Sequence, residues 1–463
     1  MQKTLLIKIS VIVFLILLLL IPLSMIKGQI SDRKYYQQDV RNSISQSWTG
    51  KQMIIGPFLV IPYKVFTDYK VWNDDKTEKV SKTSIENKYT FVIPDDLSIN
   101  SEIEDRMKYK GIYQIPVYTS VNTIAGKLTK DSILNIIKNI KFNNSKVEIL
   151  PAYLSLSISD PRGINKIQLL EWNEEMIEFI PGSKNKIDKD GVHALIPNIE
   201  DVTKDINFNI DFSLRGMEQL SFAPTGKNTT LSAKSLWPHP EFIGDFLPYE
   251  NEITDKGYKA KWMLSSFSFD SSSVIEACAI SECENIYQKF KSLGVRHVDP
   301  VNVYLKSERS VKYALLFIGL SFVAFFLFEI LRKLPIHPIQ YTLVGLSLSI
   351  FYLLLLSLSE HISFGLSYLI SMLSCTFVLA VYLKSILKDT KVAAIFSAVL
   401  LLLYSTLYVI INAEDFALLM GAGLTFIILT IVLFTTRKID WYALDININK
   451  SSQKLSRDES ILK

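Results

Sequence analysis

The histidine side chains, which could bind a metal or move a proton, are few and scattered along this 463-residue chain. None has a second histidine, a cysteine or a carboxylate at the spacing that a zinc site uses, so we expect no metal and no cofactor. A nucleophile-elbow Gly-x-Ser-x-Gly, a Walker A loop and a His-Glu-x-x-His pattern are also absent. The sequence therefore gives no reason to expect an enzyme. The histidines are His193, His239, His297, His337 and His361.

A short proline-rich stretch contains the histidine with the most unusual neighbours. Trp237 and Pro238 precede His239, and Pro240 follows it. Two prolines around one residue make a stiff loop. The loop is a candidate binding loop, or else a rigid corner of a β domain. We favour the corner, because proline and tryptophan often serve packing alone.

Two cysteines, Cys278 and Cys283, lie five residues apart. If their segment is exported, an oxidising compartment would allow a disulfide between them. So short a closed loop would stabilise the protein by only about 2 kcal/mol. The alternative is a pair of independent thiols, and the sequence does not decide between the two.

The last third of the chain contains five apolar runs without a charged residue. Each is close to the roughly 20 residues that a helix needs to cross a bilayer. A further apolar run near the N-terminus follows Lys3 and Lys8. It is too long for a signal peptide and has a poor cleavage site, so we expect an uncleaved anchor. The sequence thus predicts six transmembrane helices: one anchor at 9–27, and runs at 313–328, 338–359, 362–383, 392–413 and 416–436.

The lysines and arginines of the short loops alternate with acidic loops, which predicts the orientation. Basic residues favour the cytoplasmic side, so both termini are expected in the cytoplasm of a bacterial inner membrane. The net charge of +4 is small and gives no reason to expect nucleic acid binding. The predicted domains are a cytoplasmic N-terminus (1–8), the anchor (9–27), a periplasmic β-rich domain (28–310), a five-helix bundle (311–436) and a cytoplasmic tail (437–463).

The exported segment has mostly the period-two pattern of strands. The clearest case is 206–214, where isoleucine, phenylalanine and leucine alternate with polar residues. Strands without alternating helices predict a sandwich-like β domain. We also expect a long polar loop at 70–88 and a disordered tail at 445–463. The other predicted elements are strands at 89–93, 112–124, 152–158 and 259–269, and helices at 131–140 and 284–293.

The predicted bundle carries its ionisable residues only at the ends of its helices. A proton-coupled or ion-coupled transporter would place them near the midplane. Ser363, Ser367 and Ser371 instead recur at every fourth residue, a spacing typical of close helix packing in lipid. Cys375 lies in the middle of a run, where we expect it to serve packing.

Three basic residues stand where the β domain enters the membrane. Lys306, Arg309 and Lys312 are three apart, so a continuous helix places them on nearly one face. They lie on the outer side, against the charge rule. They either extend towards lipid headgroups or pair with acidic loop residues such as Glu360 and hold the β domain against the bundle.

Several motifs along the chain resemble the CreD family of bacterial inner-membrane proteins. The resemblance rests on the segments 309–313, 337–341, 357–361, 440–442, 235–240, 242–244 and 111–113. It implies a role in cell-envelope integrity under stress from agents such as β-lactams and colicins, and it carries over no catalytic residue. We expect a non-enzymatic scaffold or sensor whose partners are the lipid bilayer and envelope proteins or glycans. The alternative is a transporter or a membrane-bound enzyme acting on an envelope lipid or glycan.

Overall fold

The chain folds into two units. One comprises residues 1–38 and 301–463, and the other residues 39–300. The computed structural model describes residues 3–72, 79–144, 146–185, 187–281, 286–298, 303–332, 336–387, 390–413 and 416–437. The expected disordered tail at 445–463 lies outside these residues.

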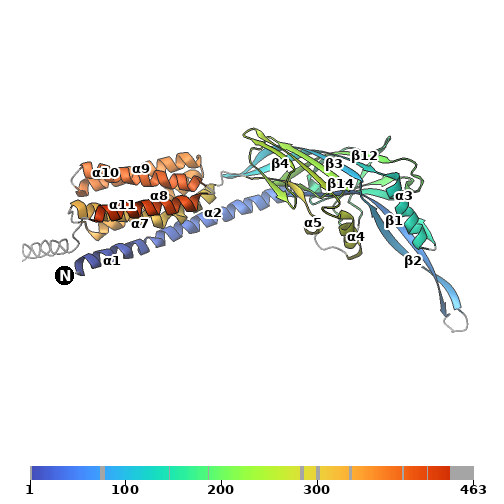
Figure 1. Cartoon of the computed structure of the whole chain (residues 1–463), viewed down its shortest axis with the longest axis horizontal. Helices are drawn as coiled ribbons and strands as arrows, with labels where there is room; N and C mark the ends of the chain where they lie inside the picture. The colour runs from blue at the N-terminus through green and yellow to red at the C-terminus, as the bar shows by residue number, and fades with distance from the viewer. Residues whose placement is uncertain are drawn as a thin grey trace, which may run out of the picture. The chain divides into compact units, whose positions relative to one another are not determined.

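The first unit is helical (Figure 1). Among the described residues, five helices are long and apolar enough to cross a membrane. A sixth span is reached only if α6 and α7, which are bent by 45° at their junction, count as one. The helices of this unit are α1 (Lys3–Leu18), α2 (Leu20–Ser47), α6 (Val303–Lys312), α7 (Ala314–Arg332), α8 (Pro338–Ser359), α9 (Phe364–Leu387), α10 (Thr390–Asn412) and α11 (Ala417–Thr436).

The second unit is built mainly of strands, which form two nine-stranded sheets. The first sheet contains β1 (Gln52–Trp72), β2 (Lys79–Val92), β5 (Val147–Ile149), β6 (Ala152–Ile158), β10 (Phe179–Pro181), β11 (Gly191–Ile196), β13 (Gln219–Phe222), β15 (Pro240–Gly244) and β18 (Leu293–His297). The second contains β3 (Asp96–Lys110), β4 (Tyr113–Leu128), β7 (Ile164–Ile167), β8 (Leu170–Trp172), β9 (Glu175–Ile177), β12 (Ile206–Met217), β14 (Asn228–Ser235), β16 (Glu250–Thr254) and β17 (Gly257–Ser265).

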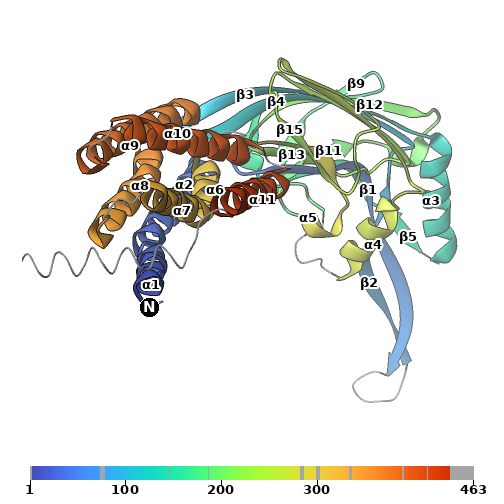
Figure 2. The ribbon, with the colours of Figure 1, turned by 60° about the vertical axis from the view of Figure 1, so that its left-hand side comes forward.

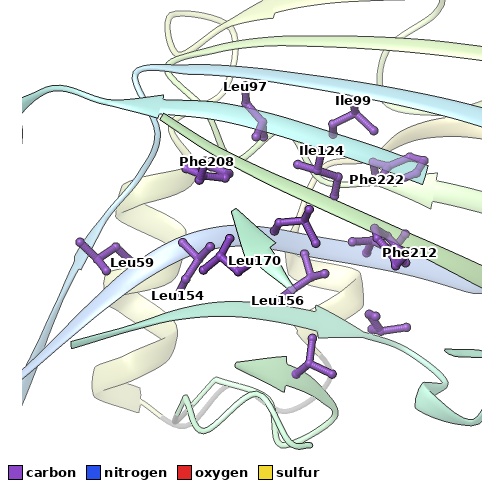
Figure 3. Close-up of a cluster of buried hydrophobic side chains, with 14 of the residues drawn as sticks. Leu59, Leu97, Ile99, Ile124, Leu154, Leu156, Leu170, Phe208, Phe212 and Phe222 are labelled. Carbon is purple, nitrogen blue, oxygen red and sulfur yellow. The ribbon is translucent and has the colours of Figure 1, made fainter. Parts of the chain in front are cut away.

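The two sheets share one hydrophobic core, so the prediction of a β-rich domain is confirmed. Leu154 and Leu156 of the first sheet and Phe208 and Phe212 of the second belong to it (Figure 3). Strand β12 buries every second residue from Ile206 onwards, because successive side chains point to opposite faces of a sheet.

Two short helices, α4 (Ser271–Ser281) and α5 (Ile286–Lys289), pack on a second apolar cluster of the first sheet. The predicted helix at 284–293 is wrong in its second half. Only α5 is helical there, and Leu293 already starts β18. Gly294 pairs with Ser221 of β13, so it belongs to a ladder and does not end a helix. The helical spacing of the apolar residues was outweighed by pairing with a neighbouring strand.

The expected loop at 70–88 is wrong at 70–72 and 79–88, which are strands, while 73–78 lie outside the described residues. Strands β1 and β2 pair in register from Leu59 opposite Val92 to Trp72 opposite Lys79. Figures 1 and 2 both show this hairpin extending beyond the rest of the β unit. Both faces of such a ribbon meet solvent, so its strands are polar and lack the alternation that predicts a half-buried strand.

The boundary between the units differs from the predicted positions 28 and 310. It falls inside α2, after residue 38, and again after residue 300. The end of α2 belongs to the β unit because Ile44 packs against Ile115, Val117 and Met217. In addition, Arg162 Nη1 donates to the carbonyl of Gln46 at 2.8 Å and so caps the helix.

The N-terminus of α3 (Lys130–Asn143) gives the β unit a pH-dependent contact. Burial alone would raise the pKa of Asp95, but hydrogen bonds from Lys227 and Thr129 outweigh it and lower the pKa below its usual value. A carboxyl with a lowered pKa stabilises the fold above its unfolded pKa of about 3.9, and this stability is lost as the pH falls through the folded value.

We therefore expect Asp95→Asn to weaken the β unit at pH 7 and to make less difference from about pH 4 downwards. Hydrogen exchange of α3 as a function of pH measures this. Asp131→Asn is the control, since Asp131 lies in the first turn of α3, whereas Asp95 accepts from the N-cap residue Thr129 from outside the helix. An equal pH dependence in both variants would contradict the assignment.

Candidate functional site

The β unit contains an open cleft of about 940 Å³. Residues 102–107 of β3 line it, together with the end of β14 and the β16–β17 turn. Its volume is within the range of about 300–1,000 Å³ that is common for ligand sites. The cleft is therefore a candidate ligand site.

A buried histidine joins the two sheets beside this cleft. His297 of β18 in the first sheet contacts Asp105 of β3 through Nδ1 and lies 2.9 Å from the Tyr258 hydroxyl through Nε2. Because a carboxylate can only accept, we assign the proton to Nδ1, and the tyrosine hydroxyl then donates to Nε2. Ser235 Oγ donates to the second oxygen of Asp105 at 2.5 Å. We call His297, Asp105, Tyr258 and Ser235 the histidine lock.

Aromatic rings enclose the histidine lock. The Trp237 ring stacks on the His297 ring, with centroids 5.8 Å apart and planes at 15°. Tyr118 and Tyr258 meet the same histidine edge-on at 6.3 and 5.7 Å. Burial, followed by the nearby Asp105 carboxylate, raises the pKa of Tyr258 far above its usual value, so this hydroxyl stays protonated and can donate.

The walls of the cleft carry charges of both signs. Lys234 and Glu102 form an ion pair of 2.5 Å across β14 and β3, and Arg106 pairs with Glu104 at 2.9 Å. These pairs are largely exposed, so each contributes only about 0–1 kcal/mol to stability and is available to a ligand. The remaining charged lining residues are Asp105, Glu252, Lys256 and Lys259.

The polar groups of the histidine lock are hydrogen-bonded to one another. Ser235 donates to Asp105, and both nitrogens of His297 are already engaged. Within the described ranges no three histidine, cysteine or acidic side chains are grouped so that they could hold a metal.

The candidate binding loop takes part in this site through one residue. Trp237 lines the cleft, stacks on His297 and donates from Nε1 to the carbonyl of Val298 at 3.1 Å. His239 is exposed, and Pro240 begins β15 opposite His297. Pro238, His239 and Pro240 thus form a corner between two strands, while Trp237 belongs to the cleft.

Sequence reasoning missed the histidine lock itself. Asp105 and His297 are 192 positions apart and come from different sheets, so no spacing in the sequence points to them. Cys278 is buried and disulfide-bonded. Cys283 lies outside the described residues, so the bridge between these two stays a prediction.

The residues expected at the junction make contacts inside the helical unit. Glu360 pairs with Arg33 of α2 at 3.3 Å and accepts from the Tyr304 hydroxyl at 3.3 Å. Lys306 lies 3.3 Å from Asn412 Oδ1 and 5.6 Å from the Phe364 ring centroid. Sequence reasoning did not consider Arg33 as the partner of Glu360, because the polar half of α2 was assigned to the exported domain. That Lys306, Arg309 and Lys312 hold the β domain against the bundle stays a hypothesis.

A buried charged cluster joins three other helices of this unit. Glu329 of α7 contacts Lys8 of α1 and accepts from the Tyr341 hydroxyl of α8 at 2.7 Å. Only 6% of the Glu329 side chain is exposed. Sequence reasoning placed this residue at a helix end near Arg332 and did not identify Lys8 as its partner.

Two of the three serines spaced along α9 are buried. Ser367 and Ser371 are fully buried, whereas Ser363 is exposed. Helix α9 packs against α8 and α10, so a larger side chain at 367 meets neighbouring helices. We expect Ser367→Leu to destabilise the protein by about 1–3 kcal/mol through overpacking.

The control is Leu366→Ala, because this neighbouring side chain is 56% exposed. Thermal unfolding in detergent compares the two variants. If both melt alike, the close contact at Ser367 does not exist.

Comparisons with known proteins include a full-length relative. A family model described as inner membrane protein CreD matches residues 4–442. The inner membrane protein CreD of Escherichia coli (strain K12) is 34% identical over 448 residues, which is 96% of each chain. Among solved structures, an M1 zinc metallopeptidase from Deinococcus radiodurans covers 37% of this chain and 38% of its own at 6% identity, with a TM-score of 0.19. A mutant of the same enzyme gives 0.21 at 7% identity over the same shares. These two scores are too low to support any argument.

Proposed function

We propose, from the premise that this chain belongs to the CreD family of inner membrane proteins, that it maintains cell-envelope integrity by binding an envelope component in the cleft of its β unit. In this proposal the protein is a scaffold or sensor and not an enzyme. The β unit lies in the periplasm and both termini lie in the cytoplasm. The proposed topology has six spans, with α6 and α7 forming one bent span.

The orientation is supported by the loop charges. Lys384 follows the apolar part of α9 and Arg437 follows α11, whereas Glu360 and His361 lie between α8 and α9. Basic residues favour the cytoplasmic side. Reporter fusions after His361 should therefore score as external, and fusions after Arg437 as internal. An internal signal after His361 would invert the topology.

The observation that carries the binding role is the cleft beside the histidine lock. The lock is a fully connected polar network beside the cleft, joining β3, β14 and β17 to β18 of the other sheet. Such a network rigidifies the wall against which a ligand would rest. The mixed charges and the aromatic side chains of Trp237 and Tyr258 provide the polar and apolar contacts that ligand sites combine.

The test is a photo-crosslinker placed in the cleft of the full-length protein in living cells under β-lactam stress. A benzophenone side chain at Val121, which is 57% exposed and lines the cleft, should give a specific adduct. The same group at Met263, 69% exposed on β17 and outside the cleft lining, is the matched control. Substituting Val121→Arg should lower survival under β-lactam, and Met263→Arg should not. Equal adducts and equal survival at both sites would contradict the binding role.

The alternative of a transporter is favoured by one observation, the partly buried Lys8–Glu329 pair among the helices. Charged residues inside a membrane bundle often mark a transport path. Glu329 lies in the last turn of α7, however, and its contacts are satisfied by Lys8 and Tyr341. Survival of a variant in which both charges are replaced by apolar residues tests this alternative.

A further inference from the structure

One edge of β3 has no strand partner over its second half among the described residues. Strand β14 pairs with β3 in parallel only as far as Ser235 opposite Ile103. On the other side, β4 continues to pair with β3 up to Lys110 opposite Tyr113. Residues 104–110 therefore present main-chain N–H and C=O groups that no described strand satisfies, over about 24 Å.

The cleft lies along the first part of this free edge. Residues 102–107 of β3 line one side together with Thr119 and Val121 of the neighbouring β4, and the β16–β17 turn, residues 254 and 256–259, lines the opposite side. Leu236 and Trp237 line it where the chain leaves β14. The space that a continued β14 would occupy is thus part of the cleft, and neighbouring strands need about 4.8 Å of separation there.

Side chains along the edge alternate between the two faces of the sheet, so those on the exposed face can contact the side chains of an added strand. Glu104 and Arg106 point to the exposed face, while Asp105 between them is held by His297 and Ser235. On the exposed face, an added strand would place a cation beside Glu104 and an anion beside Arg106, because cross-strand pairs of opposite charge are favourable. Lys108 follows on the same face, where its Nζ lies 4.4 Å from the centroid of the Trp48 ring.

We propose that the cleft binds an extended polypeptide segment, which adds as a strand to residues 104–110 of β3. This inference rests on the proposed function and names the chemical class of its ligand. Main-chain hydrogen bonds to the free edge supply the affinity, and the alternating charges of Glu104 and Arg106 supply the register. The histidine lock keeps β3 and β18 fixed, so the edge is already extended before the peptide arrives.

A peptide fits the cleft better than a glycan does. Sugar rings are usually held by an exposed aromatic face, but one face of Trp237, the one ring of its size in the cleft, is already covered by His297. An unpaired strand edge, in contrast, offers regularly spaced donors and acceptors that match another extended main chain.

The test uses fluorescein-labelled heptapeptides and the full-length protein in detergent. The two probes are TKVEVET and its reverse, TEVEVKT. Each places a lysine beside Glu104 and a glutamate beside Arg106, the first when it adds parallel to β3 and the second when it adds antiparallel. We expect at least one of them to raise its fluorescence anisotropy saturably. The same peptide N-methylated at alternate residues keeps its side chains but loses edge hydrogen bonds, and should bind at least about tenfold more weakly.

Variants of the protein test the register. Arg106→Glu should weaken the binding of the favoured probe roughly threefold to tenfold, and a probe with lysine in place of the matching glutamate should restore it. Arg296→Glu is the control, since Arg296 is an arginine of β18 that also pairs with a glutamate, Glu241, but does not line the cleft.

The outcomes separate this inference from the proposed function. If the N-methylated peptide binds as well as its parent, or neither heptapeptide binds, the strand-addition mode is overturned. Saturable binding of chitotetraose to the cleft, abolished by Val121→Arg, would overturn the peptide as ligand and leave the proposed binding role intact. The proposed role is itself contradicted only by equal crosslinking and equal survival at Val121 and Met263.

Discussion

Replacing Glu329 by alanine should lower the stability of the helical unit by about 3–5 kcal/mol. The carboxylate is almost fully buried, contacts Lys8, and accepts from Tyr341 and from the main-chain N–H of Ile336. The variant leaves Lys8 without its buried partner, and leaving one charge of a buried pair uncompensated costs more than the pair itself contributes. Thermal unfolding in detergent should show a clear fall in melting temperature.

The matched control for this prediction is the ion pair of Glu308 and Lys34, both in the same unit. The Glu308 side chain is 46% exposed, and its oxygen lies 3.0 Å from Lys34 Nζ. Exposed pairs contribute about 0–1 kcal/mol, so Glu308→Ala should change the melting temperature little. If both alanine variants melt alike, Glu329 is solvated and the buried cluster is not a stabilising feature.

A double variant distinguishes a structural role of the Lys8–Glu329 cluster from a role in transport. Lys8→Met together with Glu329→Leu removes both charges and fills similar volumes, which is often neutral or stabilising for a buried pair. If stability returns and cells still survive β-lactam stress, the cluster is structural and a transport path through it is excluded. If stability returns but survival is lost, the charges take part in function, and the transporter alternative gains support.

The general architecture could be predicted because it depends on local patterns. Apolar runs of membrane length become α8 to α11, and strict alternation becomes β12, since burial on one face requires period two. The β1–β2 hairpin was missed because prediction depends on such a burial pattern. Both of its faces are exposed, so its sequence carries no burial pattern although its ladder is complete.

The candidate site could not be predicted, because it depends on long-range pairing. His297 meets Asp105 only after β18 joins the first sheet and β3 joins the second, and neither register is visible in the sequence. The sequence also does not show where β14 ends. The chain turns away after Ser235, and only the two ladders together show that β3 continues beyond its partner. Of the predicted loop, Trp237 lines the cleft, and the sequence pointed to this loop through its aromatic residue and the two prolines that flank His239.

The second large effect is expected at His297. Replacement by phenylalanine keeps a ring beside Trp237 but removes both nitrogens, so the Asp105 carboxylate and the Tyr258 hydroxyl each lose a buried partner. Side-chain exposure is 2% for His297 and 10% for Asp105, so water replaces the lost bonds poorly. We expect His297→Phe to destabilise the β unit by about 2–4 kcal/mol. Hydrogen exchange of β3 and β18 measures the effect locally.

A second buried histidine of the β unit provides the control. His193 also meets a tyrosine ring edge-on, with Tyr153 at 5.7 Å, but its Nδ1 contacts only the carbonyl of Gly182. Because His193 has no charged partner, His193→Phe should lower the stability of the β unit by only about 1 kcal/mol. Equal losses in the two variants would show that ring packing, and not the bond to Asp105, holds the lock.

The double variant His297→Phe with Asp105→Leu completes the test of the histidine lock. It removes the carboxylate that the single variant leaves unpaired. The double variant should therefore lose about 1–2 kcal/mol less stability than the sum of the losses in the two single variants. Because the strand edge at 104–110 depends on β3 staying fixed, His297→Phe should also weaken heptapeptide binding while His193→Phe leaves it unchanged. Additive losses would mean that Asp105 and His297 do not act together, and the fixed edge of β3 would then need another support.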